Sequence, residues 1–292
     1  MKVIMQHTIE TAISGRGKGR DGNSIGYTLS PAPENTGIRV LRIDMPPTEV
    51  FNSKVVLSQS GWLHDEYFSI PSLKPMLSVL RALGIDNVII EVEGAALPCM
   101  ENSVELLVFL IKSAGKRTQH TSKRSIKLLQ PLVVSEKGKW IRLIPSNAFR
   151  FACLNSSFQK AFPVHNFGSM IQFSESIFVT EICRARPLHE IKMQWDTLNE
   201  SLESHQTSVN IKQKLVKEIN AREILLSVSE LSYLGVNLSL DYVSFNADDA
   251  LREKLIENIA EHAELYFSFY DEVDEDGENN SVANYSIAAG LG

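Results

Sequence analysis

The clearest hydrophobic pattern in the chain lies between residues 72 and 92. Ser72 can cap the start of a helix there, and Gly84 provides the left-handed residue just past its last turn. Residues 87–92 follow as an apolar run rich in β-branched residues, so we expect a helix packed against a strand. Apolar side chains recur at steps of three and four on one face of this predicted helix, at Leu73, Met76, Leu77, Leu80 and Leu83.

Three strands are predicted ahead of this helix, at residues 3–13, 24–29 and 37–43, where β-branched residues are separated by Gly, Pro and Asn. Residues 15–22 join the first two and contain four glycines and three basic residues. Such a loop can hold a phosphate, but it lacks the P-loop spacing and no helix follows to add its dipole. A solvated hairpin loop is therefore our default interpretation, with phosphate binding as the alternative.

A second helix is predicted over residues 102–114, between Asn102 as a cap and Gly115 at its end. The second half of the chain then repeats this order of strands and helices. Its predicted elements are strands at 126–135, 139–144 and 149–154, a helix at 175–184 capped by Ser174, a polar stretch at 196–207, a long helix at 211–234 ended by Gly235, a strand at 236–240, and a helix capped by Asp248 and Asp249 that reaches Tyr266.

The two halves share a sequence of elements, since each ends in a helix, a glycine, a strand and a capped helix. We therefore predict an α+β protein of two similar domains, each a mixed β-sheet packed against two α-helices in a two-layer sandwich. The domains are placed at residues 1–116 and 126–270. The basic, polar segment 117–125 is interpreted as a linker. Residues 271–292 are expected to form a disordered tail, because six acidic residues fall within 271–278.

The composition is typical of an ordinary soluble globular protein, with 43% hydrophobic and 22% charged residues among 292. A net charge of -6 argues against nucleic-acid binding and against attraction to anionic membrane surfaces. The three cysteines, Cys99, Cys153 and Cys183, lie far apart in apolar segments, so we expect buried thiols. No stretch approaches the ~20 apolar residues of a transmembrane helix, and we expect a cytoplasmic protein.

Several motifs along the chain resemble those of one enzyme family. Residues 31–37 read like P-A-P-x-N-T-G, residues 83–92 like L-G-I-D-N-x-x-x-E-V, and residues 97–103 like I-P-I-M-D-G-S. Matches in the second half are Gly138-Lys139-Trp140 to D-K-W, Arg184-Ala185-Arg186 to R-A-R, and Ala250-Leu251 with Lys254-Leu255 to the last helix. The chain thus resembles the zinc-dependent UDP-3-O-acyl-N-acetylglucosamine deacetylases of lipid A synthesis in Gram-negative bacteria. The resemblance implies two deacetylase-like α/β sandwich domains facing each other across an active-site cleft.

The residues that carry the family's chemistry are missing from the matching positions. The family's V-E-H-L supplies a glutamate base and a zinc-binding histidine, and here the resemblance places Lys74 and Pro75 at those positions. Its H-K-x-x-D on the long helix supplies two more zinc ligands, and these positions carry Arg222 and Leu226, with Glu223 in place of the lysine. Proline and leucine have no metal-binding atom, and lysine at neutral pH is a cation rather than a base.

The family's general-acid histidine falls on Asp249. Without zinc nothing would lower the pKa of an attacking water toward ~7, so we expect no zinc and no amide hydrolysis by this mechanism. Lys74 and Arg222 should instead make the old metal position cationic and repel Zn²⁺. None of the seven histidines forms an HxxxH or HxH pair. His64-Asp65-Glu66 is the densest ligand-type cluster, for which a solvated loop is the default interpretation and a metal site the alternative.

The preferred hypothesis is a catalytically inactive homologue, a pseudoenzyme, that acts by binding and regulates lipid A or envelope synthesis. Its partner would be a protein of that pathway such as the true deacetylase. A second hypothesis keeps the cleft as a ligand site, where Lys139, at the family's D-K-W lysine, joins Lys74 and Arg222 to hold a UDP-sugar or another phosphorylated ligand. Lys139 as a plain surface residue at a strand edge is the alternative.

A third hypothesis is an active zinc-dependent deacetylase, or another hydrolase, with a relocated site that uses Asp249, Glu223 and His64. The small, apolar C-terminal residues 288–292 also suggest a signal for regulated proteolysis, which some members of the family carry. An unstructured end is the alternative interpretation of that segment.

Overall fold

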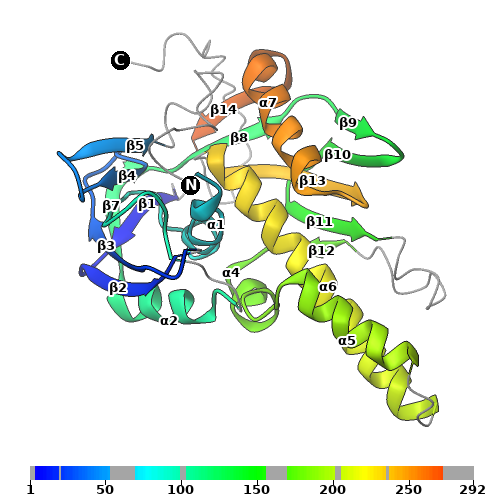
Figure 1. The fold of residues 1–292 in the computed structure, drawn as a ribbon. Helices are drawn as coiled ribbons and strands as arrows, with labels where there is room; N and C mark the ends of the chain where they lie inside the picture. Colours follow the sequence, from blue (N-terminus) through cyan, green and yellow to red (C-terminus); the bar gives the residue numbers. More distant parts are fainter. Residues whose placement is uncertain are drawn as a thin grey trace.

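The computed structural model of the protein describes residues 4–19, 21–52, 70–98, 103–155, 170–200, 205–234 and 237–271. These residues form a five-stranded sheet in the first half, a seven-stranded sheet in the second, and a separate two-stranded ribbon (Figure 1). The ribbon pairs β1 (Met5–Ile9) with β7 (Lys116–Ser122) in antiparallel fashion. The expected α+β class is confirmed.

The five-stranded sheet has the order β2-β3-β6-β4-β5. β6 (Val88–Val92) is its middle strand, antiparallel to β3 on one side and parallel to β4 on the other. Alternate β6 side chains are fully buried, which is why its sequence is rich in β-branched residues. The remaining strands are β2 (Ile13–Lys18), β3 (Ser24–Pro31), β4 (Ile38–Arg42) and β5 (Thr48–Asn52).

The predicted first helix is α1 (Lys74–Ala82), which a 3₁₀ turn over Ile70–Leu73 precedes. Its predicted apolar face is buried, but Ser78 and Val79 on the other side are buried as well. The reason is that α6 (His205–Leu231) of the second half packs along α1, so the helix is covered on more than one face.

The expected caps of this helix have mixed outcomes. Gly84 has the left-handed φ of 68°, as predicted. The predicted cap at Ser72 is wrong, because α1 begins after Leu73 without a side-chain cap and the Ser72 hydroxyl accepts the Leu97 N–H at 2.9 Å. The second helix, α2 (Glu105–Ala114), begins after Val104. Asn102 and Gly235, predicted at helix ends, lie outside the described residues.

The seven-stranded sheet has the path β12-β11-β13-β10-β9, with β8 beside β13 and β14 beside β8. The long strand β13 (Asn237–Phe245) pairs in parallel with β11 and antiparallel with β10. Its other strands are β8 (Arg124–Leu128), β9 (Leu132–Glu136), β10 (Lys139–Pro145), β11 (Phe149–Leu154), β12 (Ile171–Gln172) and β14 (Phe267–Asp271). Helices accompany it at α4 (Glu175–Ile177), continued by a π-helical turn over Phe178–Ile182, and at α5 (Leu188–Glu200), α6 and α7 (Asp249–Tyr266).

The polar stretch expected at 196–207 is partly helical, because α5 reaches Glu200 and α6 already starts at His205. α5 and α6 form a hairpin that projects from the body of the molecule (Figure 1). The hairpin has a small apolar core of its own, separate from the main one. A weak apolar pattern was enough to form α5, since only one narrow face packs against α6. The core residues of the hairpin are Ile191, Trp195, Leu215, Val216 and Ile219.

The predicted linker over residues 117–125 is wrong as a description of local structure. Most of this segment is the strand β7, and β8 begins at Arg124. Gln119 and Lys123 are buried although both are polar, because they form hydrogen bonds or ion pairs inside the protein. The domain boundaries at 116 and 126 stay predictions, and the buried apolar side chains of both halves form one continuous core.

The glycine-rich loop is shorter than predicted, because Gly15 and Gly17 lie in β2 and pair with β3. A Cβ at Gly15 would lie 2.4 Å from the Tyr27 ring, so this glycine makes room for an aromatic side chain on the neighbouring strand. A packing role accounts for Gly15 without a phosphate. In the described part of the chain, no helix is both long and apolar enough to cross a membrane. Residues 272–292, the predicted tail, lie outside it.

Candidate functional site

Lys74 is the first residue of α1, and its side chain points to the second half of the protein. Its Nζ lies 2.9 Å from Glu230 Oε2 and 3.6 Å from Glu253 Oε1. The Glu230 side chain is only 2% exposed and the Lys74 side chain 12%. Burial raises the pKa of Glu230, and the positive charge of Lys74 opposes that rise. The position that the resemblance assigns to a catalytic base is thus a cation in a buried ion pair.

A second buried ion pair lies deeper in the second half, where Arg252 of α7 contacts Glu223 of α6. Both side chains are almost fully buried, and Arg252 Nη1 also lies 3.3 Å from Asp249 Oδ1. Burial raises the pKa of Glu223, and the opposing effect of Arg252 does not cancel that rise. Glu223 and Asp249, two members of the relocated site considered above, are therefore both held by one guanidinium group.

Arg222 and Leu226 lie one turn apart on α6, at two positions that the resemblance assigns to zinc ligands. Arg222 donates a long hydrogen bond of 3.5 Å to the Ala185 carbonyl oxygen. Burial lowers the pKa of Arg222, and the nearby carboxylates of Asp249, Glu223 and Glu190 oppose that effect. A guanidinium stays charged in proteins and offers only donors, and leucine has no polar atom, so neither can bind a metal.

Lys139 lies on β10 and forms an ion pair with Asp248, away from the Lys74 pair. Asp248 Oδ1 also accepts the Leu251 N–H at 3.0 Å, so Asp248 caps α7 as predicted. The Lys139 hydrogen bond holds the pKa of Asp248 below its usual range. Lys139 therefore supports a helix cap, and the structure does not bring it together with Lys74 and Arg222 in one ion-pair cluster.

The expected cationic centre is wrong, because carboxylates accompany each cation. Glu230, Glu253 and Arg252 were missed as members of this centre. Glu230 had a detectable signal, since it is a charged residue among the apolar positions near the end of the long helix, whereas nothing local marks Arg252 as buried. The centre contains the cations Lys74, Arg222 and Arg252 and the carboxylates Glu223, Glu230, Asp249 and Glu253.

These residues do not fit a zinc ion. Structural and catalytic zinc sites use three or four nitrogen, sulfur or carboxylate ligands. Pro75, Arg222 and Leu226 offer none, and the described ranges contain no group of three or more His, Cys, Asp or Glu side chains arranged to hold a metal. His64-Asp65-Glu66, the alternative cluster, lies outside the described residues.

The two described cysteines, Cys153 and Cys183, are buried free thiols, as predicted. Burial raises the pKa of Cys153 to about 12, so its thiolate is not populated at neutral pH. Burial also raises the pKa of Cys183. Neither is an activated nucleophile. Cys99 lies outside the described residues.

One group of the motif residues that the chain does share with the family lies at the other end of α1. Asn87 accepts the Gly37 N–H at 2.7 Å and donates to Gln6 Oε1 at 2.8 Å and Gln119 Oε1 at 2.7 Å. The neighbouring Asp86 accepts the His7 backbone N–H at 2.8 Å. These contacts join β1, β7, the P-A-P-x-N-T-G turn and the start of β6, so the motif holds the fold together.

Asp86 is also bound by a buried lysine of the ribbon end. Its Oδ1 lies 3.0 Å from Lys123 Nζ. Burial acts to raise the pKa of Asp86, but hydrogen bonds from His7 and the positive charge of Lys123 outweigh burial, and the net pKa is lowered. The cluster is therefore charged, paired and structural.

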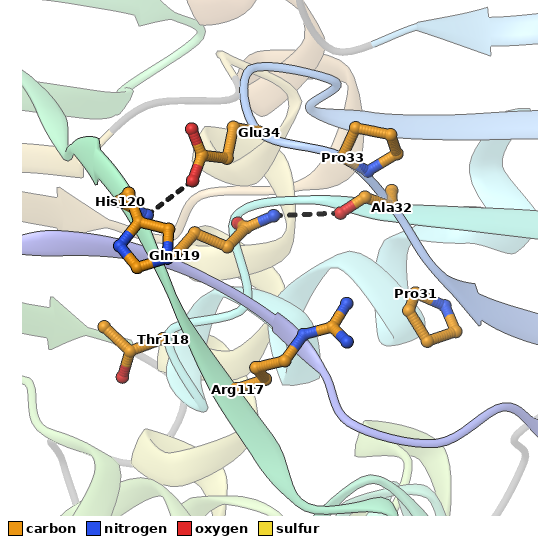
Figure 2. Close-up of a pocket in the computed structure, with 8 residues that line it drawn as sticks. All are labelled: Pro31, Ala32, Pro33, Glu34, Arg117, Thr118, Gln119 and His120. Carbon is orange, nitrogen blue, oxygen red and sulfur yellow. Dashed lines mark hydrogen bonds between the residues drawn. The ribbon is translucent and has the colours of Figure 1, made fainter.

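An open pocket of about 680 Å³ lies between the Pro31–Glu34 turn and β7 (Figure 2). Gln119 Nε2 donates to the Ala32 carbonyl oxygen at 2.9 Å, and the His120 backbone N–H donates to the Glu34 carboxylate. Hydrogen bonds from Thr121 and His120 hold the pKa of Glu34 below its usual range. The pocket thus contains no carboxylate poised as a base, and it is separate from the Lys74 centre.

Comparisons with known proteins agree with the motifs. A family model described as UDP-3-O-acyl N-acetylglycosamine deacetylase matches residues 6–261. Proteins named UDP-3-O-acyl-N-acetylglucosamine deacetylase are 33% identical over 195 residues in Idiomarina loihiensis, 34% over 189 residues in Legionella pneumophila strain Corby, and 33% over 193 residues in Shewanella oneidensis. Each alignment covers 63% of this chain and 62% of the relative, so it spans less than two thirds of the relatives' length. The chain belongs to the UDP-3-O-acyl N-acetylglycosamine deacetylase family.

Proposed function

We propose that this protein is a non-catalytic member of the deacetylase family, which acts by binding and regulates lipid A or envelope synthesis. The observation that carries the proposal is the donor set at the positions of the family's zinc ligands. Pro75, Arg222 and Leu226 present no atom with a lone pair suited to a metal. The motifs that hold the fold together are kept, so the scaffold remains while the chemistry is lost.

The remaining catalytic positions support the same conclusion. An ammonium group has no lone pair to accept a proton from water, so Lys74 cannot replace a glutamate base. Asp249 is bound to the guanidinium of Arg252 on the same helix. This ion pair engages the carboxylate that would have to replace the family's general-acid histidine.

A protein partner is favoured over a UDP-sugar as the bound species. Two of the three cations considered for a phosphorylated ligand already have carboxylate partners, Lys74 in Glu230 and Lys139 in Asp248. Arg222 forms no ion pair within 4.0 Å among the residues described, so it alone remains for a phosphate. One guanidinium surrounded by carboxylates is a weak site for a diphosphate. The partner we propose is the true deacetylase or another protein of envelope synthesis.

The first test measures metal content and activity together. The protein is purified without chelator, its zinc is measured by atomic emission, and acetate release from UDP-3-O-acyl-N-acetylglucosamine is followed beside a deacetylase relative as positive control. We expect zinc far below one ion per chain and no acetate above background. Stoichiometric zinc with acetate release would show instead an active deacetylase with a relocated site.

The second test distinguishes a protein partner from a ligand. Calorimetry with UDP, UDP-N-acetylglucosamine and their acylated forms should show no heat up to millimolar concentrations. Cross-linking in a Gram-negative host, followed by co-purification at low salt, should recover a protein of lipid A or envelope synthesis. Heat with a UDP-sugar that Arg222→Ala abolishes would favour the ligand hypothesis. Recovery of no such protein would contradict the proposal.

A further inference from the structure

Three helices from the two halves meet around the Lys74 side chain. Lys74 begins α1, Glu230 lies one residue before the end of α6, and Glu253 lies in the first half of α7. Among the described residues, Lys74 is the one cation that lies within 4.0 Å of the Glu230 carboxylate. The contact therefore joins the two halves of the protein through one ammonium group.

The buried carboxylate of Glu230 needs a cation to remain charged in this place. Glu230 is 2% exposed, and the negative charge of Glu253 adds to the effect of burial in raising its pKa. Glu230 Oε1 is also fully buried without a hydrogen-bond partner among the described residues. A buried carboxylate oxygen without a donor is an acceptor that a cation or N–H group would satisfy.

The helix dipoles favour this contact, because each charge is stabilised by the end of the other helix. A cation at the first residue of α1 faces the positive end of its own helix dipole, and an anion at the end of α6 faces the negative end of its own. Each charge is unfavourable on its own helix and favourable at the end of the other. Pro75 adds to this arrangement, because it removes one of the N–H groups that Lys74 would otherwise face.

We propose that Glu230 and Glu253 form a binding site for a primary ammonium ion, which in this protein is permanently occupied by the side chain of Lys74. Lys74 Nζ lies 2.9 Å from Glu230 Oε2 and 3.6 Å from Glu253 Oε1, and the buried Glu230 Oε1 still lacks a partner, so these oxygens offer up to three acceptors to the three N–H donors of an ammonium group. Divalent metals require four to six ligands, which these oxygens do not supply. The inference stands on this contact alone and does not rest on the loss of deacetylation.

The test removes the tethered ammonium and supplies a free one. Lys74→Ala deletes three carbons and the nitrogen, which is the composition of n-propylammonium. We expect Lys74→Ala to unfold at a lower urea concentration than wild type. At n-propylammonium ten times its Kd, the unfolding constant of the variant should fall about 11-fold, by binding to the folded state alone. Wild type, whose site is filled, should not respond beyond a salt control.

Matched controls separate charge, shape and site. n-Propanol has the shape without the charge, tetramethylammonium has the charge without N–H donors, and the triple variant Lys74→Ala/Glu230→Gln/Glu253→Gln lacks the carboxylates. None of these should reproduce the rescue. Equal rescue by propanol, or rescue of the triple variant, would overturn the site. Rescue by Mg²⁺ or Mn²⁺ without rescue by the amine would show a metal site in place of the ammonium site.

A second measurement uses a chain that keeps Lys74 and does not depend on folding of the alanine variant. Acetylation of native protein, followed by mass spectrometry, should modify Lys74 more slowly than Lys137, whose side chain is 86% exposed. In Glu230→Gln/Glu253→Gln the Lys74 rate should approach that of Lys137. An equal rate for both lysines in wild type, or an unchanged ratio in the variant, would contradict occupation of the site.

Discussion

Two buried polar clusters lie at the two ends of α1, and they differ in the motif residues that they contain. The cluster after its C-terminal end, around Asn87, keeps the motif residues of the deacetylase family. The cluster at its first residue, around Lys74, has Lys74 and Pro75 where the resemblance places the family's glutamate base and zinc-binding histidine. Under the proposed function, the residues at the end of the helix serve folding, and the positions at its start are those at which the family's chemistry has been lost.

The clusters also differ in how their atoms are satisfied. The Asn87 amide oxygen accepts one hydrogen bond and its nitrogen donates two, all to neutral groups. Glu230 Oε1 and Arg252 Nε in the second cluster are buried without a hydrogen-bond partner among the described residues, and in the first cluster His7 Nδ1, beside Asp86, is as well. The neutral network of Asn87 fixes geometry at little desolvation cost, whereas buried ion pairs, such as Asp86–Lys123 in the first cluster and Lys74–Glu230 in the second, lose much of their attraction to desolvation. Substitution of Asn87 in the first cluster should thus destabilise the protein. In the second cluster, replacement of both Lys74 and Glu230 by apolar residues should be tolerated.

The largest expected effect is on Arg252, the most buried cation of the second cluster. Arg252→Met leaves Glu223 buried without its partner, which should lower the free energy of unfolding by about 3–5 kcal/mol. Urea denaturation followed by circular dichroism measures the loss. Arg142→Met removes an exposed arginine on β10 that has no carboxylate partner within 4.0 Å in the described residues, and it serves as control. A loss below that of the control would mean that Glu223 finds another cation.

Asn87→Ala should have the next largest effect. It leaves the Gly37 N–H without an acceptor and Gln119 Oε1 without its Asn87 donor, while Gln6 Oε1 keeps the Asn35 N–H, so we expect a loss of about 2 kcal/mol. Asn23→Ala, at an exposed turn, is the matched control. If Asn87→Ala were as stable as the control, the motif could not be explained by folding, and a functional role for this end of α1 would have to be considered.

The sequence could predict the first cluster's setting better than the second's. The apolar stripe of α1, Gly84 and the strand β6 follow from local spacing, and the structure confirms them. The residues that pair with Lys74 are 156 or more positions away, and such a pairing leaves no local signal. The family resemblance drew attention to Lys74 but did not reveal its carboxylate partners, because it assigns positions and not contacts.

The sequence pattern also failed to predict two elements with polar sequences, β7 and α5. β7 has a polar sequence because most of its side chains are exposed and its buried residue, Gln119, forms hydrogen bonds inside the protein, so its pattern resembled a linker. α5 was hidden because its apolar face is narrow and its remaining positions are polar. In both cases a tertiary contact replaced the local hydrophobic signal on which the prediction depended.

The pH dependence of stability should have opposite signs in the two clusters. The pKa of Asp86 is lowered, so its contribution is present above the unfolded value of about 3.9 and is lost as pH falls through the folded pKa. The pKa of Glu230 is raised, so its contribution is full at low pH and is lost as pH rises above about 4.3. We expect these pH-dependent changes in the free energy of unfolding to be smaller than the losses caused by Arg252→Met or Asn87→Ala.

Urea denaturation of wild type, Asp86→Asn and Glu230→Gln between pH 3 and pH 7 measures these contributions. The difference in unfolding free energy between wild type and Asp86→Asn should grow as pH rises. The difference between wild type and Glu230→Gln should shrink over the same range. Parallel curves for wild type and Glu230→Gln would mean that Lys74 cancels the burial of Glu230 completely, and the contrast between the clusters would then be weaker than proposed.

The smallest expected effect comes from replacing a whole ion pair. Lys74→Met/Glu230→Met removes both charges and fills a similar volume, and such replacements of buried pairs are neutral or stabilising, so we expect a change within about 1 kcal/mol of wild type. Lys74→Met alone should be clearly less stable, since it leaves Glu230 uncompensated. Thermal and urea denaturation of the three proteins compares them directly. If the double variant were as unstable as the single one, the pair would contribute net stability, and α1 would be held by charge at its start as firmly as by amide hydrogen bonds at its end.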